Sequence, residues 1–164
     1  MDSNEIREKL KEGGISFKEV FHPPLFSSQE AHAFGFENQE AEAKNLFVKG
    51  KGKYLLLTVK ADKRVDLKRL GKSMGLGHLT FVKPEEMMAL ISLSPGSVTP
   101  MGLLNDMDDL VPLLLDKDFQ NKEIYVHPNV NTSSILLYGN DLKLFLERNG
   151  KRVEWTIFTE VEND

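Results

Sequence analysis

Three short polar segments contain the residues of this chain that could do chemistry. In Ala43-Lys44-Asn45-Leu46-Phe47, a lysine and an amide side chain stand at the start of an apolar run, where a strand end can reach a cleft. Gly96-Ser97-Val98-Thr99-Pro100, followed by Gly102, combines glycine, which permits unusual backbone angles, with proline, which fixes φ. His127-Pro128-Asn129-Val130-Asn131-Thr132 is a polar stretch directly after another apolar run. A rigid loop of the second kind can aim backbone N–H and C=O groups at an acyl group and so polarise it without a dedicated side chain.

Each of these segments also has an ordinary structural interpretation. Lys44 can be a surface lysine, the glycine-proline loop a simple connection, and His127 a strand-end residue bonded to the backbone. Composition and spacing alone therefore indicate no more than a soluble α/β domain with a basic edge.

The common catalytic signatures are missing from the sequence. It contains no HExxH, no Walker loop, no GxGxxG and no GxSxG. The absence of cysteine removes disulfides, thiolate zinc sites and thiol nucleophiles together. The four histidines lie far apart, with no pair at metal-ligand spacing, and no serine is marked as the nucleophile of a triad, although sequence order alone leaves a triad open. We expect neither a metal nor a cofactor.

The charge of the chain is unevenly distributed. The formal net charge is −4, yet the segment from Lys44 to Lys72 holds ten basic residues against Asp62 and Asp66, a local net charge of +8. The rest of the chain therefore carries −12. Such a segment is either a solvated hairpin and helix or a face that binds phosphates, and charge alone leaves both open.

Two further features concern location. Residues 1–12 are charged and lack the apolar run of a secretory signal, and the longest apolar runs, such as Leu110 to Leu115, are far too short to span a bilayer. We expect a cytoplasmic protein that does not bind membranes.

The elements that would position the three segments are strands and helices that alternate without a strict βαβ rhythm. Capping boxes at Asp2/Glu5 and Ser27/Glu30 predict two helix starts, and Gly50-Lys51-Gly52-Lys53 predicts a hairpin turn. We therefore expect one domain over residues 1–164, of mixed α/β (α+β) class, with helices packed on a mixed sheet. The expected strands are 16–22, 45–49, 54–60, 78–82, 111–115, 123–127, 133–138 and 153–158, and the expected helices are about 2–12, 28–34, 66–73, 84–91 and 141–149.

The ordered set of segments resembles the YbaK/prolyl-tRNA synthetase-associated editing-domain family of aminoacyl-tRNA deacylases. The likeness covers nearly the whole chain, and within the family it is strongest to the free-standing branch that clears alanine from proline tRNA. It implies a strongly curved mixed sheet. It is carried by His22-Pro23-Pro24, by Lys44-Asn45-Leu46-Phe47, by Gly96 to Pro100 with Gly102-Leu103-Leu104-Asn105, and by His127-Pro128-Asn129 with Asn131-Thr132.

The resemblance also implies roles for individual residues. Lys44 would hold the terminal adenosine or its phosphate, and His127 would line a small amino-acid pocket. The loop residues Gly96, Ser97, Val98, Thr99 and Pro100 would bind the aminoacyl end and help to place the attacking water. Further substrate contacts are expected from Asn45, Phe47, Gly102, Asn129 and Thr132, and contacts to the tRNA from Lys49, Lys51, Lys53, Lys63, Arg64, Lys68, Arg69 and Lys72.

The implied chemistry needs no metal and no covalent enzyme intermediate, and the ribose 2′-hydroxyl of the tRNA assists the water. A second, smaller pocket makes physical sense, because one methylene gives a synthetic site only about 1–3 kcal/mol of discrimination. We expect a monomer that acts on tRNA, with prolyl-tRNA synthetase as a further partner to be tested. Two alternatives stay open: a module that senses an amino acid or charged tRNA without hydrolysis, and a deacylase for another small residue, cysteine or serine.

Overall fold

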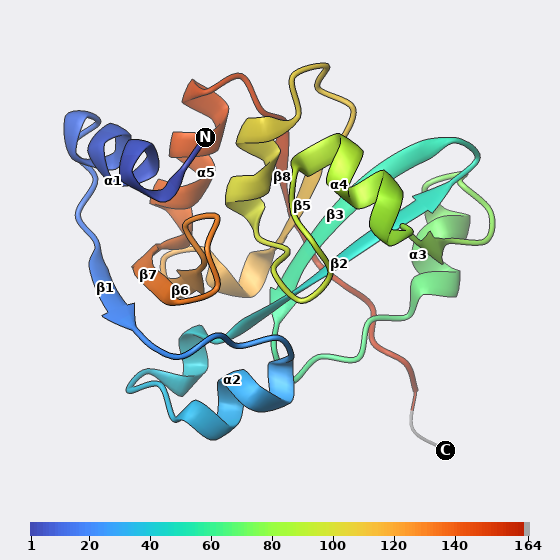
Figure 1. Ribbon diagram of the computed structural model, residues 1–164. Coiled ribbons are helices and arrows are strands. Elements are labelled where there is room, and N and C mark those ends of the chain that lie inside the picture. Colours follow the sequence, from blue (N-terminus) through green and yellow to red (C-terminus); the bar gives the residue numbers. More distant parts are fainter. Residues whose placement is uncertain (163–164) are drawn as a thin grey trace.

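The computed structural model describes residues 1–162, and their strands form two separate sheets (Figure 1). The larger sheet has five strands in the order β4-β2-β3-β5-β8. Strands β4, β2 and β3 pair antiparallel, whereas β5 pairs parallel to both β3 and β8. Its members are β2 (Ala43–Gly50), β3 (Lys53–Lys60), β4 (Thr80–Phe81), β5 (Leu113–Asp116) and β8 (Val153–Thr156).

The β2–β3 hairpin is the longest feature of this sheet and crosses the molecule in Figure 1. Its turn forms where the sequence predicts it, with Lys51 (φ 49°) and Gly52 (φ 75°) both in the left-handed region. Such a turn matches the right-handed twist of the flanking strands. The base of the hairpin, where Ala43 pairs with Lys60, lies at the opposite end from the turn.

The smaller sheet contains three antiparallel strands in the order β1-β7-β6. The pairing of β1 with β7 joins parts of the chain that are remote in sequence, since Lys18 lies opposite Leu136. The strands are β1 (Lys18–Phe21), β6 (Glu123–Val126) and β7 (Ser133–Tyr138).

Five α-helices and three short 3-10 helices complete the described chain. The predicted capping boxes are present, since Asp2 accepts from the amide of Glu5 and Ser27 from that of Glu30. Figure 1 shows α3 beside the turn of the β2–β3 hairpin and α2 near the start of β2. The α-helices are α1 (Ser3–Glu12), α2 (Ser28–Phe34), α3 (Leu67–Ser73), α4 (Pro84–Ile91) and α5 (Gly139–Arg148), and the 3-10 helices are η1 (Gln39–Ala41), η2 (Pro100–Asn105) and η3 (Lys117–Phe119).

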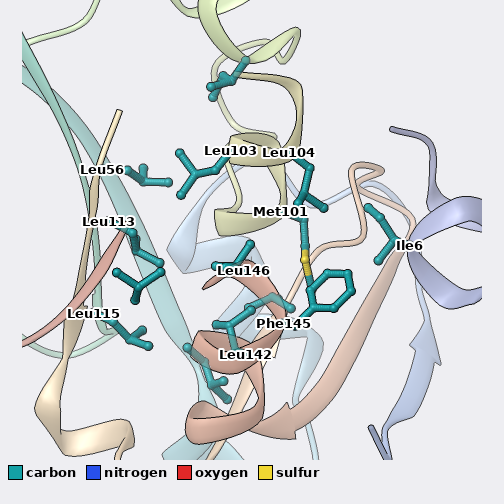
Figure 2. Close-up of a cluster of buried hydrophobic side chains, with 14 of the residues drawn as sticks. Ile6, Leu56, Met101, Leu103, Leu104, Leu113, Leu115, Leu142, Phe145 and Leu146 are labelled. Carbon is teal, nitrogen blue, oxygen red and sulfur yellow. The ribbon is translucent and has the colours of Figure 1, made fainter. Parts of the chain in front are cut away.

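Successive side chains of the five-stranded sheet point to opposite faces and belong to two hydrophobic clusters, one on each face. Leu56 of β3 points into the main core with side chains of β5, α1, α5 and η2 (Figure 2). Leu55 and Leu57 belong to a second cluster, against which Leu67 and Leu70 of α3 pack. Both faces of this sheet are therefore covered.

The mixed α/β fold predicted from the sequence is confirmed, and every expected helix and strand is present near its predicted position. The strands divide between two sheets, and several are shorter than predicted, because the alternation of apolar residues continues beyond the hydrogen-bonded part. The run expected at 78–82 contributes only the two residues of β4. The structure adds η2 within 100–105, which local residue patterns did not predict. No helix within residues 1–162 has the length and apolar character to cross a membrane.

Candidate functional site

Lys44 is the second residue of β2 and lies half-buried at the base of the hairpin. Burial lowers the pKa of its ammonium group, while Asp62 and Glu160 act in the opposite direction and Arg64 adds to the lowering. Within residues 1–162, no carboxylate lies within 4.0 Å of the Lys44 ammonium. A partly desolvated cation without a direct partner in that part of the chain can bind an anionic group of a ligand.

Asn45 links β2 to the loop that precedes η2. Its Nδ2 donates to the carbonyl of Val98 at 3.1 Å, while its Oδ1 accepts from the hydroxyl of Thr58 at 2.6 Å. The carbonyl of Val98 fixes which end of the amide faces the loop, because a carbonyl oxygen can only accept and therefore needs the NH₂ group. The side chain of Asn45 therefore holds the loop against the strand that carries Lys44.

The loop from Gly96 to Pro100 takes its shape from close backbone contacts at both ends. Gly96 has φ of +83°, and a Cβ atom there would lie 2.8 Å from the carbonyl oxygen of Phe26. At the other end, the buried hydroxyl of Thr99 donates to the carbonyl of His127 at 2.7 Å and accepts from the amide of Met101. At position 96, only glycine can adopt the positive φ and also avoid a clash with the carbonyl oxygen of Phe26.

His127 follows β6 directly, and its ring is fixed by the neighbouring strand β7. Nδ1 lies 3.1 Å from the carbonyl of Ser133 and 3.3 Å from the hydroxyl of Ser134. The ring of His22 packs edge-on against it at 5.8 Å between centroids. Burial lowers the pKa of His127, and the proximity of His22 adds to this effect. The imidazole is therefore held neutral at physiological pH.

These three segments meet at one cavity of about 260 Å³. Of the residues predicted from the sequence, the structure places Lys44, Asn45, Gly96, Val98 and His127 in its wall. The remaining wall comes from residues that were not predicted to be site residues: Leu25, Phe26, Ser27, Ser28, Ala31, Ala43 and Leu46. Phe26 is 57 % exposed, so it offers an aromatic ring to solvent next to the cavity.

The other predicted catalytic and substrate contacts lie outside the cavity wall. Phe47 is a core residue that packs on Tyr54, and a Cβ atom at Gly102 would meet Leu93 at 2.7 Å, so close packing explains that glycine. Asn129 donates to the carbonyls of Met1 and Met101. Thr132 is exposed, and its carbonyl accepts from the amide of His22. The amide of Ser97 donates to the carbonyl of Ser94 within one turn, and Thr99 and Pro100 form the buried end of the loop.

The residues predicted to contact tRNA divide into three groups. Lys49 forms an ion pair with Glu86, and Lys63 is bonded to Asp116 and Asp118 at 2.8 Å each. Arg64 lies near the base of the hairpin, where it influences Lys44. The exposed residues Lys51, Lys53, Lys68, Arg69 and Lys72 lie on the hairpin turn and on α3, and none of them forms an ion pair within residues 1–162.

A second, larger hollow of about 560 Å³ adjoins the cavity and shares Ser28 with it. Its wall comes from α2, η1 and the base of the hairpin, and it includes the buried carboxylate of Glu42, which lies 3.3 Å from His32. The sequence did not predict a site here, because these residues come together only through the fold.

Known proteins resemble this chain over most of its length. Residues 22–145 match the model of the aminoacyl-tRNA editing domain family. The chain is 32% identical over 155 residues to the prolyl-tRNA editing protein ProX of Acetoanaerobium sticklandii, covering 92% of this chain and 94% of that protein. It is 31% identical over 153 residues to prolyl-tRNA synthetase associated domain-containing protein 1 of Mus musculus, covering 89% and 90%.

A solved structure of a candidate trans-editing enzyme for prolyl-tRNA synthetase superimposes with a TM-score of 0.71 at 23% identity, covering 97% of both chains, which shows a shared fold. The family match spans the loop from Gly96 to Pro100, both strands of the hairpin and His127, and thus most of the cavity wall. The chain belongs to the aminoacyl-tRNA editing domain family.

Proposed function

We propose that this chain hydrolyses mischarged aminoacyl-tRNA in trans, with alanine on proline tRNA as its substrate. The observation that carries the proposal is the convergence of Lys44, the Gly96–Val98 backbone and His127 on one small cavity, in a chain of the editing-domain family. The names of the relatives in Acetoanaerobium sticklandii and mouse both refer to prolyl-tRNA editing or its synthetase, which supports proline tRNA as the carrier.

In the proposed complex, the aminoacyl group enters the 260 Å³ cavity and the terminal nucleoside lies toward the adjoining hollow. The ammonium of Lys44 stands between the two and holds the terminal adenosine or its phosphate. Backbone groups of the Gly96–Pro100 loop, fixed by Asn45 and Thr99, face the ester. Fixed dipoles of this kind stabilise the charge that develops on the ester oxygen without reorganising during the reaction.

The reaction is the addition of water to the ester carbonyl, followed by cleavage of the bond between the acyl carbon and the ribose oxygen. The amino acid leaves as the free acid, and the ribose oxygen takes up a proton. The ribose 2′-hydroxyl of the substrate assists the water, as the family resemblance implies. An aminoacyl ester is already activated, so positioning and charge stabilisation supply most of what catalysis needs.

Selection against proline requires that the part of the cavity that receives the side chain admits a methyl group but not the proline ring. A synthetic site for proline rejects the smaller alanine poorly, because the two differ by little apolar surface. A second site that admits alanine and excludes the larger ring removes the error after charging. The short side chains of Ala31, Ala43 and Ser27 in the cavity wall leave space for the amino acid, and Val98 and Leu46 limit it.

The partners follow from the same proposal. We propose that the chain acts as a cytoplasmic monomer, where charged tRNA is available, and that the exposed basic residues of α3 and the hairpin turn bind the phosphates of the acceptor stem. An association with prolyl-tRNA synthetase would deliver the mischarged tRNA directly.

The test is the release of each amino acid from proline tRNA charged with alanine, cysteine, serine or proline, with a chelator present throughout. We expect rapid release of alanine, slow release of cysteine and serine, and none of proline. Lys44→Ala should reduce kcat/KM at least tenfold, whereas Lys18→Ala, at an exposed strand position, should leave it unchanged. Tight tRNA binding without any deacylation would contradict the proposal and favour a sensor, and faster release of cysteine or serine would reassign the substrate.

A further inference from the structure

Behind the cavity, His127 belongs to a chain of hydrogen bonds that runs through Ser134 to His22. Nδ1 of His127 lies 3.3 Å from Oγ of Ser134, and the same Oγ lies 2.8 Å from Nε2 of His22. Nδ1 of His22 in turn lies 2.9 Å from the carbonyl oxygen of Pro23. Ser134 and His22 are 2% and 7% exposed, so water does not substitute for these contacts.

The hydrogen positions in this chain follow from its two ends. A carbonyl oxygen can only accept, so Nδ1 of His22 carries the hydrogen that goes to Pro23, and Nε2 of the neutral ring is left as an acceptor. Ser134 must then donate its single hydrogen to His22. Its oxygen can only accept from His127, whose Nδ1 also faces the carbonyl of Ser133. The hydrogen of neutral His127 is therefore on Nδ1.

The opposite nitrogen of His127 is left free. Within residues 1–162, Nε2 makes no hydrogen bond, and it is not one of the fully buried polar atoms that lack a partner there. The ring lines the cavity, so a ligand can reach this nitrogen.

We propose that His22 and Ser134 are positioning residues that hold His127 in the Nδ1–H form, so that its Nε2 accepts a hydrogen bond from a donor on the bound aminoacyl group. The α-ammonium group is the donor that every aminoacyl ester carries. The ligand part of this inference rests on the proposed function, whereas the tautomer is a property of the protein alone.

His22 acts on this chain through the hydroxyl of Ser134, which can either donate or accept, whereas the carbonyl of Ser133 favours the Nδ1–H form by itself. With His22 present, the hydroxyl hydrogen has an acceptor at 2.8 Å and turns away from His127. Without that acceptor, a buried hydroxyl would donate to Nδ1 of His127 instead, because leaving it unsatisfied costs about 1–3 kcal/mol. The hydrogen of His127 would then move to Nε2, which would turn the acceptor in the cavity into a donor.

The packing of His22 suits this task. Its ring is held edge-on by Phe34 at 5.4 Å and by Phe36 at 5.7 Å between centroids. A phenyl group at this position would keep an aromatic ring against Phe34 and Phe36 and remove both nitrogens, although the ring is one atom larger. His22→Phe is therefore the variant that tests the hydrogen-bonding role with the least change in packing.

The experiment is a long-range ¹H–¹⁵N NMR correlation of the histidine rings in the full chain without ligand, above the usual pKa of histidine, with His127 assigned by the loss of its signals in His127→Asn. In the unaltered protein we expect Nδ1 of His127 to be the protonated nitrogen. His22→Phe should shift the proton to Nε2. The double variant His22→Phe/Ser134→Ala should return it to Nδ1, because only the carbonyl of Ser133 then remains as a neighbour.

Ser133→Ala provides the matched control. It makes the same chemical change one residue away at a buried site, its side chain points to the other face of β7, and its hydroxyl makes no hydrogen bond of normal geometry within residues 1–162. It should leave the tautomer of His127 unchanged.

The kinetic measurement follows the same variants on mischarged tRNA. His22→Phe should lower kcat/KM about tenfold, the loss of one ordinary hydrogen bond, and the double variant should recover most of it. A protonated Nε2 in the unaltered protein, or an unchanged tautomer in His22→Phe, would overturn the inference. A confirmed tautomer without any deacylation would instead count against the proposed function.

Discussion

Lys44 and His127 lose part of their hydration at the cavity, and the pKa of each is lowered by burial. For the lysine, the cation persists, because its ordinary pKa of 10.5 lies far above neutral pH. For the histidine, the same physical effect favours the neutral ring over a wider pH range. The wall of the cavity thus carries one cation and one neutral acceptor, a pair that can distinguish the phosphate end of a ligand from its ammonium end.

The lowered pKa of His127 predicts how activity and stability change with pH. Because the native ring binds a proton less readily than the unfolded ring, whose pKa is near 6.5, stability is complete above that value and falls as the pH decreases through the native pKa. The acid limb of kcat/KM for deacylation should therefore lie below pH 6.5.

The measurement is a pH–rate profile of the unaltered protein beside that of His127→Asn. The variant has lower activity throughout and should lack this limb. An acid limb centred at or above pH 6.5 would contradict the inferred burial of the ring.

At the scale of elements, the cavity exists because one loop is attached to two strands of different sheets. The side chain of Asn45, on β2, donates to the carbonyl of Val98 in the loop. The hydroxyl of Thr99, at the end of the loop, donates to the carbonyl of His127, which follows β6. Phe26 closes the far side, where its backbone contacts Gly96. The position of the loop therefore depends on contacts at three points.

Gly96→Ala should damage the site through contact and strain together. The left-handed φ of +83° costs about 1–3 kcal/mol for a residue with a Cβ atom, and that atom would lie 2.8 Å from the Phe26 carbonyl oxygen. We expect a lower free energy of unfolding and a loss of deacylation.

Gly35→Ala separates the two causes. Gly35 has φ of +80°, and a Cβ atom there would meet nothing within 4 Å. Both variants should lose similar stability from backbone strain, measured by denaturant unfolding, but only Gly96→Ala should lose most of its activity. Equal activity in the two variants would show that the contact with Phe26 does not position the loop.

The difference between what the sequence could and could not predict also lies at this scale. The helix caps, the hairpin turn and the order of the elements depend on local residue types, and these predictions are confirmed. Lys44 and Gly96 stood in segments that local residue types singled out, their roles came from the family resemblance, and the structure brings both to the cavity. Phe26 and Ser134 could not be selected, because an apolar residue and a strand serine acquire their positions only from long-range pairing.

At the scale of the whole molecule, the exposed basic residues of α3 and of the hairpin turn lie at the opposite end of the hairpin from the cavity. Lys44 lies at the base of β2, and the turn near Gly50 is about 20 Å away along an extended strand. Lys51, Lys53 and the basic residues of α3 surround that turn. A ligand that reached both places would have to be long and carry phosphates along its length.

Neutralising the basic residues of α3 should weaken tRNA binding without affecting the chemical step. With Lys68→Gln, Arg69→Gln and Lys72→Gln combined, we expect KM to rise and kcat to stay nearly constant. The slope of log Kd against log salt should fall by about one for each phosphate that the variant no longer neutralises.

A triple variant of equal charge change, Lys9→Gln, Lys11→Gln and Lys18→Gln, serves as the control, because these exposed residues lie on α1 and β1. If both triple variants changed the salt dependence equally, binding would reflect net charge rather than a defined surface.

The pairing of β1 with β7 has a consequence for synthesis of the protein on the ribosome. Lys18 to Phe21 are translated more than a hundred residues before their partners, Ser133 to Leu136. His22 and Phe26, which follow β1, therefore lack the strand that positions β1 until β7 has been translated. The nascent protein can complete its cavity only after Ser133 to Leu136 have been translated, so products that end before β7 have no competent site.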